Sequence, residues 1–179
     1  MVGQSLDKRK QIDMNRLINL VRKWRLRDYT PLIEILIHKN HLLENLHTFQ
    51  GACPRIEIAP VLKSNAYGHG LSEVASILEK EHCPFLCVDS YYEAMTLRNK
   101  GVRSPILVIG YTEPANLKRP PLSNVSFAII GMAHLRNIEQ ILLSPTAFHL
   151  KLDSGMHRQG ILPEELREAI AIIKKSKNI

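Results

Sequence analysis

Short runs of apolar residues alternate along the chain with longer segments whose apolar residues recur every three or four positions. A continuous run of about four to eight apolar residues is typical of a buried strand, and the wider spacing is typical of an amphipathic helix. The pattern predicts strands at residues 31–37, 56–63, 85–88, 105–109, 125–130 and 146–153. It predicts helices at residues 40–49, from Gly70 onward, and at 91–99, 134–143 and 163–175, with Gly101 ending the third of them.

This alternation predicts an α/β protein with a parallel sheet. Apolar strands that alternate with helices form βαβ units, in which helices cover the faces of the sheet. The pattern contains about five such units after an opening strand, in a chain of 179 residues. A closed barrel of eight units takes about 250 residues. We therefore predict an incomplete (β/α) TIM-type barrel, with its longest loop at residues 112–123.

Positive charge is concentrated at the amino terminus. The formal net charge is +7, of which residues 1–30 contribute +5, so the remaining 149 residues are nearly neutral. A nucleic-acid-binding domain would carry its basic residues on one folded face, so we expect no nucleic-acid partner. The apolar residues of segment 7–26 fall near helical spacing. This segment could dock on a partner or a membrane as a basic helix, or pack on its own domain, which is the commoner arrangement.

Several other classes of protein are disfavoured. No signal-peptide core and no apolar run of membrane-spanning length is present, so we expect a cytoplasmic protein without a membrane partner. Cys53, Cys83 and Cys87 lack paired C-x-x-C spacing, which favours buried free thiols over disulfides or a zinc site. His38 and His41 share helical spacing, but no Glu between them completes an H-E-x-x-H motif, and we expect no metal.

Lys63 is the first candidate for chemistry, because it ends an apolar strand and a turn with Gly68 and Gly70 follows at once. The carboxyl ends of barrel strands form the active face of such folds. In a partly dry pocket a neutral amine is favoured, and it can attack a carbonyl to form a Schiff base. Pyridoxal phosphate is a common partner, and the Tyr67 hydroxyl could reach its phosphate. The alternative is a lysine whose stem packs on the strand end while its ammonium group stays in water.

A second polar group follows in the strand predicted at residues 146–153. His149, Lys151 and Asp153 would point to one face of that strand, because side chains alternate along a strand. Arg158 follows a turn at Gly155 and could bind a phenolic oxygen of a cofactor or a substrate carboxylate with paired donors. The alternative is a salt bridge between Lys151 and Asp153, with Arg158 as a surface charge.

Together these segments resemble the alanine racemase family. The family signature around the cofactor lysine is close to V-K-A-N-A-Y-G-H-G, and residues 61–70 read V-L-K-S-N-A-Y-G-H-G. The second family motif, H-L-K-x-D-T-G-M-x-R-x-G, is similar to residues 149–160, with Ser154 in place of threonine. The resemblance covers residues 31–179 as the amino-terminal portion of a pyridoxal-phosphate barrel. It leaves residues 1–30 as a basic amino-terminal extension.

The resemblance implies a role for each candidate residue. Lys63 would hold pyridoxal 5'-phosphate and act as the base on one face of the substrate, and Tyr67 would bind the phosphate. Lys151 would occupy the position that is carbamylated in many members. Arg158 would lie near the phenolic oxygen of the cofactor and the substrate carboxylate. The implied activity is that of an isomerase that interconverts L- and D-alanine for cell-wall precursor supply. The resemblance also implies that the full-length protein is a homodimer.

The resemblance also implies that parts of the family's site lie outside these residues. The last barrel strands and the carboxyl-terminal β-domain are not represented, and that domain carries a tyrosine that serves as second base in the partner subunit. We therefore expect the isolated chain to be inactive or incomplete as a racemase. Two alternatives stay open, namely a non-catalytic barrel protein that binds pyridoxal phosphate for its homeostasis, and a truncated gene product with exposed strand edges.

Overall fold

The computed structural model describes residues 32–179, and the chain divides into two units, Met1–Leu36 and Ile37–Ile179. The helix considered at residues 7–26 lies outside the described residues. Residues 32–37 form neither helix nor strand, and Leu32 is 99% exposed. The prediction of a strand at 31–37 is therefore wrong over its described part. An apolar run becomes a strand only where its backbone pairs with a neighbour, and residues 32–37 lack such pairing.

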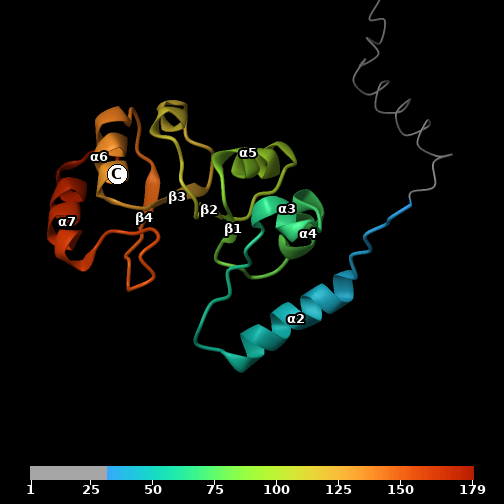
Figure 1. The fold of residues 1–179 in the computed structure, drawn as a ribbon. Helices are drawn as coiled ribbons and strands as arrows, with labels where there is room; N and C mark the ends of the chain where they lie inside the picture. The colour runs from blue at the N-terminus through green and yellow to red at the C-terminus, as the bar shows by residue number, and fades with distance from the viewer. Residues whose placement is uncertain (1–31) are drawn as a thin grey trace, which may run out of the picture. The chain divides into compact units, whose positions relative to one another are not determined.

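The second unit is built on a parallel sheet whose strand order is β1-β2-β3-β4 (Figure 1). All three pairings between neighbouring strands are parallel. The prediction of an α/β fold with a parallel sheet is thus confirmed. The strands are β1 (Leu86–Val88), β2 (Ile106–Val108), β3 (Val125–Ile129) and β4 (Ala147–Leu150).

A further segment extends this sheet beyond β1. Val61 forms an isolated parallel bridge with Cys87, and the Leu62 N–H donates to the Cys87 carbonyl at 2.7 Å. The strand predicted at 56–63 is thus present only around Val61. This short pairing is enough to place the carboxyl end of the segment at the same edge as the carboxyl ends of β1 to β4, because all of them run parallel.

Helices alternate with the strands in the predicted order, and in Figure 1 α3 to α7 lie around the outside of the strands. Helix α5 begins and ends at the predicted residues, and Gly101 has the positive φ of 87° typical of a helix stop. The predicted loop at 112–123 contains a short 3-10 turn. The elements are α2 (Lys39–Ala52), α3 (Lys63–Tyr67), α4 (Leu71–Leu78), α5 (Tyr91–Asn99), η1 (Pro114–Lys118), α6 (Met132–Ile141), η2 (Pro163–Glu165) and α7 (Leu166–Lys175).

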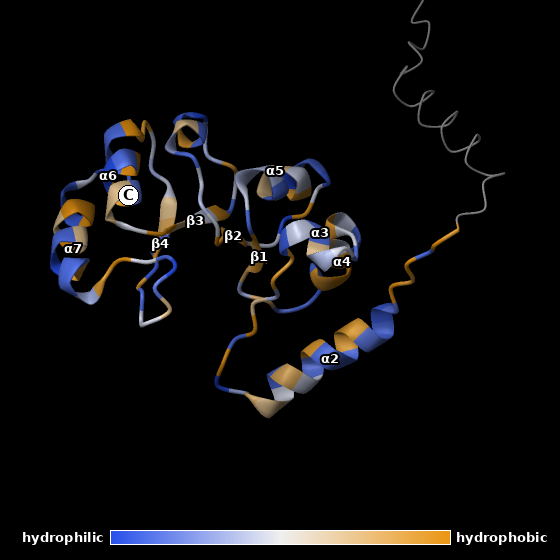
Figure 2. Ribbon diagram, in the orientation of Figure 1, coloured by the Kyte–Doolittle hydropathy of each residue, from blue (hydrophilic) through white to orange (hydrophobic). Residues whose placement is uncertain are grey.

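The hydrophobic core lies between the sheet and these helices. Figure 2 shows hydrophobic residues concentrated in the central strands, whereas α6 and α7 carry both hydrophobic and hydrophilic residues. Phe127 of β3 is fully buried, and its ring lies 6.0 Å from that of Tyr91 and 6.2 Å from that of Phe148. Core side chains come from both layers, among them Leu86, Val88, Ile106, Val108, Ile129, Leu97, Leu135, Ile138 and Ala169.

The sheet is strongly curved. Phe85 precedes β1, and His149 lies in β4, three strand positions away. In a flat sheet, with about 4.8 Å between neighbouring strands, the two residues would lie about 14 Å apart. Their rings nevertheless meet edge to face with centroids 5.1 Å apart. Because side chains stand roughly perpendicular to a sheet, this contact requires β1 and β4 to bend toward each other. The sheet therefore has a concave face, which carries His149, and a convex face covered by helices.

The three cysteines are free, as predicted, although only Cys87 is fully buried and Cys53 and Cys83 are half-buried. Burial raises the pKa of the Cys87 thiol, and burial together with the nearby Glu81 raises the pKa of Cys83. Both thiols are therefore poor nucleophiles at neutral pH. No helix in the described part of the chain is both long and apolar enough to cross a bilayer.

Candidate functional site

The two candidate lysines lie at the carboxyl edge of the sheet. Lys63 is half-buried and comes two residues after Val61, whose bridge to β1 is parallel. Lys151 directly follows β4, and its backbone N–H donates to Ile129 of β3 at 3.0 Å. The sequence predicted this edge for Lys63, whereas Lys151 was predicted inside a strand at 146–153 and lies at the edge because β4 ends at Leu150. The strand order places the two residues at its first and last positions.

The backbone of α3 after Lys63 is left-handed, so this segment is not an ordinary right-handed α-helix. Ser64, Asn65, Ala66 and Tyr67 have φ values of 55°, 57°, 52° and 54°. Each non-glycine residue in this conformation costs about 1–2 kcal/mol. The sequence predicted an open turn from Gly68 and Gly70, which do have positive φ, but it did not predict four left-handed residues before them. Such strain is concentrated at functional sites, where surrounding contacts hold it in place.

Asn65 is the centre of the hydrogen bonds inside this turn. Its backbone carbonyl accepts from the N–H groups of Gly68 and Gly70 at 3.1 and 3.0 Å. Its side-chain oxygen accepts from the Leu71 N–H at 2.8 Å, at the start of α4. The turn leaves Tyr67 61% exposed.

Glu93 ties this turn to the rest of the fold, and sequence reasoning did not select it as a functional residue. Its carboxylate accepts from the backbone N–H groups of Asn65 at 3.3 Å and Asp89 at 2.8 Å. The signal that could have revealed it is the Ser90-x-x-Glu93 spacing of a capping box, in which the acidic side chain turns back toward the helix start. Ser90 does cap α5 by accepting from the Glu93 N–H.

Residues 151–160 form a loop at the other end of the edge. The Lys151 ammonium donates to Gln159 Oε1 at 3.2 Å, and Arg158 is exposed. Asp153 departs from the expected polar row, because β4 has already ended and its carboxylate accepts from the N–H groups of Gly155 and His157. These two bonds hold the pKa of Asp153 below its ordinary value. Asp153 therefore shapes the loop, and the alternative of a salt bridge between Lys151 and Asp153 is not realised.

His134 joins two further loops at the carboxyl edge. Its buried ring donates from Nε2 to the Thr112 carbonyl at 2.9 Å, and Nδ1 accepts from the Ile130 N–H at 3.4 Å. These contacts require the neutral ring, since a protonated ring has no acceptor. Desolvation lowers the pKa of His134, while the Thr112 carbonyl and Glu113 oppose that shift.

The stability of the protein is expected to depend on pH through His134. The folded-state pKa of His134 lies below the ordinary value of 6.5. The stabilisation by the neutral ring is therefore complete above about pH 6.5 and is lost as the pH falls through the folded-state pKa. Urea unfolding followed from about pH 8 to about pH 5 should show a falling midpoint. His134→Gln should lose this part of the pH dependence, whereas His82→Gln, at an exposed position, should keep it. Equal pH slopes in the wild type and His134→Gln would contradict this assignment.

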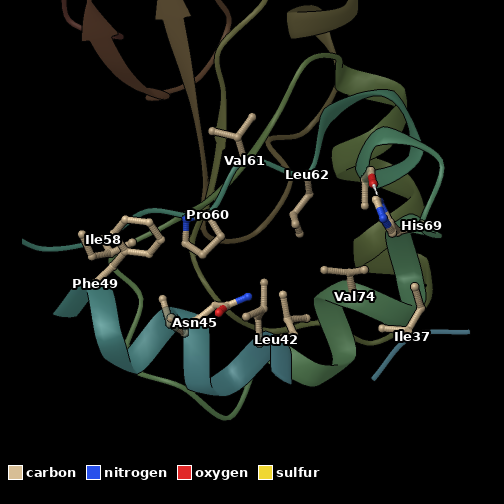
Figure 3. A pocket seen from close by; sticks show the side chains of 13 residues that line it. Ile37, Leu42, Asn45, Phe49, Ile58, Pro60, Val61, Leu62, His69 and Val74 are labelled. Carbon is tan, nitrogen blue, oxygen red and sulfur yellow. Dashed lines mark hydrogen bonds between the residues drawn. The ribbon is translucent and has the colours of Figure 1, made fainter. Parts of the chain in front are cut away.

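An apolar cavity of about 330 Å³ lies between α2, the segment at residues 58–62 and α4 (Figure 3). Asn45 and His69 are the polar residues in its lining. The His69 Nδ1–H donates to the Ala66 carbonyl at 2.8 Å, as the dashed line in Figure 3 shows. Lys63 is not among the lining residues. A phosphorylated cofactor needs several hydrogen-bond donors, so this cavity does not suit one.

The carboxyl edge, in contrast, presents groups that suit an anionic aldehyde. Lys63 brings an amine and Tyr67 a hydroxyl on one turn, and Arg158 brings a guanidinium on the loop that follows β4. The side of Gly68 is open, since no atom lies within 4 Å of the position a Cβ would take. The turn therefore leaves room for a ligand beside Gly68.

Comparison with known proteins gives the family. The family model described as "Alanine racemase, N-terminal domain" matches residues 37–179. An alanine racemase of Latilactobacillus sakei is 35% identical over 157 residues, which is 82% of this chain and 40% of that protein. The solved alanine racemase of Clostridium difficile 630 has a TM-score of 0.69 and 30% identity, covering 82% of this chain and 41% of that one. A histidine racemase from Leuconostoc mesenteroides has a TM-score of 0.71 and 27% identity, covering 78% of this chain and 39% of that one.

These matches confirm the predicted incomplete barrel, because the solved alanine racemase of Clostridium difficile 630 aligns with 82% of this chain. The chain spans less than half the length of the curated relatives it matches. The family model spans residues 37–179, and the alanine racemase of Latilactobacillus sakei is 35% identical to the chain. We conclude that the chain belongs to the alanine racemase family and contains its N-terminal domain.

Proposed function

We propose that this chain is the cofactor-binding part of a pyridoxal 5'-phosphate-dependent amino-acid racemase that interconverts L- and D-alanine. The observation that carries the proposal is Lys63, a half-buried amine at the carboxyl edge of a parallel sheet, followed by a left-handed turn. D-alanine formed in this way would supply cell-wall precursors, as the family resemblance implies. The substrate is an amino acid, and the histidine racemase among the structural relatives makes substrate choice a point to test.

Each residue at the edge has a role in the proposal. Lys63 would hold the cofactor through its amine, the group that can react with an aldehyde. Tyr67 donates its hydroxyl to the phosphate, and Arg158 holds the phenolic oxygen and the substrate carboxylate with its paired donors. Lys151, if carbamylated, would become an anion able to orient Arg158 from the same loop. Pyridoxal phosphate, when bound, delocalises the negative charge left on the α-carbon by proton removal.

Racemisation requires proton transfer on both faces of the α-carbon. Lys63 can remove or return the proton on one face only, because it approaches from a single strand end. By the family resemblance the second base is a tyrosine of the partner subunit's carboxyl-terminal domain. We propose that a homodimer containing that domain completes the site.

The cofactor part of the proposal is tested by adding pyridoxal phosphate to the full 179-residue chain. A visible absorption band should remain with the protein through gel filtration. Absence of any retained band would overturn the proposal that this chain binds the cofactor.

The racemase part is tested separately with L-alanine, L-serine and L-histidine, followed by chiral chromatography. The chain alone is expected to capture the cofactor and to produce no D-amino acid. Addition of the complementary carboxyl-terminal part of a full-length relative should produce D-alanine in preference to the other two products. Rapid racemisation by the chain alone would contradict the need for a second base from elsewhere, and capture without turnover in both samples would favour a non-catalytic pyridoxal-phosphate carrier.

A further inference from the structure

The left-handed turn after Lys63 is held mostly by hydrogen bonds to residues close in sequence. The donors and acceptors of these bonds lie within six positions of each other, as in the bond from the Leu71 N–H to Asn65 Oδ1. Local bonds of this kind stabilise the shape of the turn. They do not tie residues 64–68 to the sheet, whereas the Leu62 N–H, which donates to the Cys87 carbonyl, ties the residue before Lys63 to β1.

Glu93 supplies the hydrogen bond that ties the turn itself to a part of the chain distant in sequence. The hydrogen bond between its Oε1 and the Asn65 N–H joins residues 28 positions apart. Its Oε2 accepts at the same time from the Asp89 N–H at 2.8 Å, directly after β1. One half-buried carboxylate on α5 thus connects the turn of Lys63 with the carboxyl end of the neighbouring strand.

The chemistry of a carboxylate suits this arrangement. Both of its oxygens are acceptors, so two backbone N–H groups can be satisfied together. A glutamine has one acceptor oxygen and an amide nitrogen that can only donate, so it can keep one of the two bonds. An alanine keeps neither.

We propose that Glu93 is a positioning residue for Lys63, which holds the left-handed turn against the end of β1 and so aims the amine at the cofactor. This inference rests on the proposed function, because it assigns to Glu93 a part in cofactor capture. It also makes a claim about the turn itself that can be measured without a cofactor.

The first measurement is hydrogen exchange of residues 64–68 in the cofactor-free protein. Glu93→Ala should raise the exchange rates of these amides by about tenfold, the equivalent of about 1.4 kcal/mol. Glu93→Gln should raise them less. Ser90→Ala is the matched control, because it removes the cap of the same helix and leaves both oxygens of Glu93 in place.

The second measurement is the rate at which pyridoxal phosphate is captured by the same variants. Glu93→Ala should slow capture by about tenfold or more, Glu93→Gln should lie between it and the wild type, and Ser90→Ala should capture at the wild-type rate. Unchanged capture in Glu93→Ala, or equal slowing in Ser90→Ala, would overturn the proposal.

The outcomes separate this inference from the proposed function. If the wild type captures no cofactor, the proposed function fails, while the exchange rates still decide whether Glu93 holds the turn. If the wild type captures the cofactor and Glu93→Ala does so equally fast, the inference alone fails. Should Glu93→Ala not fold, as judged by circular dichroism, Glu93→Gln decides the question by the same two measurements.

Discussion

Replacement of Lys63 with alanine is expected to abolish the visible absorption band that pyridoxal phosphate forms with the protein. The band depends on a covalent bond to an amine, and alanine has none. Lys63→Arg should fail equally, since a guanidinium stays protonated and does not condense with the aldehyde at neutral pH. The free energy of unfolding of both variants should lie within about 0.5 kcal/mol of the wild-type value, because Lys63 is only half-buried.

The control for this prediction is Lys100→Ala, which removes an exposed lysine at the end of α5. It should retain the full absorption band, measured after gel filtration at matched protein concentration. A band of wild-type intensity in Lys63→Ala would show that the cofactor reacts elsewhere. Equal loss in Lys100→Ala would point to non-specific reaction with surface amines.

Replacement of Arg98 with alanine is expected to lower the free energy of unfolding by about 3 kcal/mol, a large part of the 5–15 kcal/mol typical of a domain. The guanidinium donates to four backbone carbonyls, those of Ser123 and Val102 at 2.7 Å and of Ser104 and Asn124 at 2.8 Å. These carbonyls belong to the loops that lead into β2 and β3. Loss of Arg98 would leave several of them without a partner in a partly desolvated place, where burial also lowers the pKa of Arg98.

Urea unfolding should resolve this effect. Arg98→Lys should be intermediate, because an ammonium is a compact donor that cannot span four carbonyls as the planar guanidinium does. Arg167→Ala is the control, since it removes an exposed arginine of α7 and should change stability by no more than about 0.5 kcal/mol. Equal stability of Arg98→Ala and Arg167→Ala would show that these carbonyls are satisfied without Arg98.

The sequence predicted the helices of the second unit better than the first two predicted strands, at residues 31–37 and 56–63. Helix α5 was found at its true bounds because Ser90 caps it and Gly101 follows it, and both signals act locally. The run at residues 31–37 has the same apolar character as β2, yet it forms no strand in its described part. Pairing with a neighbour decides that outcome, and pairing depends on residues far away in sequence.

The candidate site was predicted in part for the same reason. The position of Lys63 at the carboxyl edge follows from the alternation of strands and helices, whereas Lys151 was predicted inside a strand that in fact ends at Leu150. The left-handed backbone of residues 64–67 was not predictable, because serine, alanine and tyrosine have no intrinsic preference for it. It is held by hydrogen bonds among residues 62–71 together with the long-range bond from the Asn65 N–H to Glu93.

The proposal depends most on Lys63 as the residue that carries the cofactor. The most direct test is to reduce the complex of the chain and pyridoxal phosphate with borohydride. The reduced protein is then digested, and the modified peptide is mapped by mass spectrometry. Reduction fixes the bond, so the label marks the amine that formed it. The account predicts one modified peptide, with the added mass on Lys63. A label on Lys151, or one spread over several lysines without preference for Lys63, would contradict it.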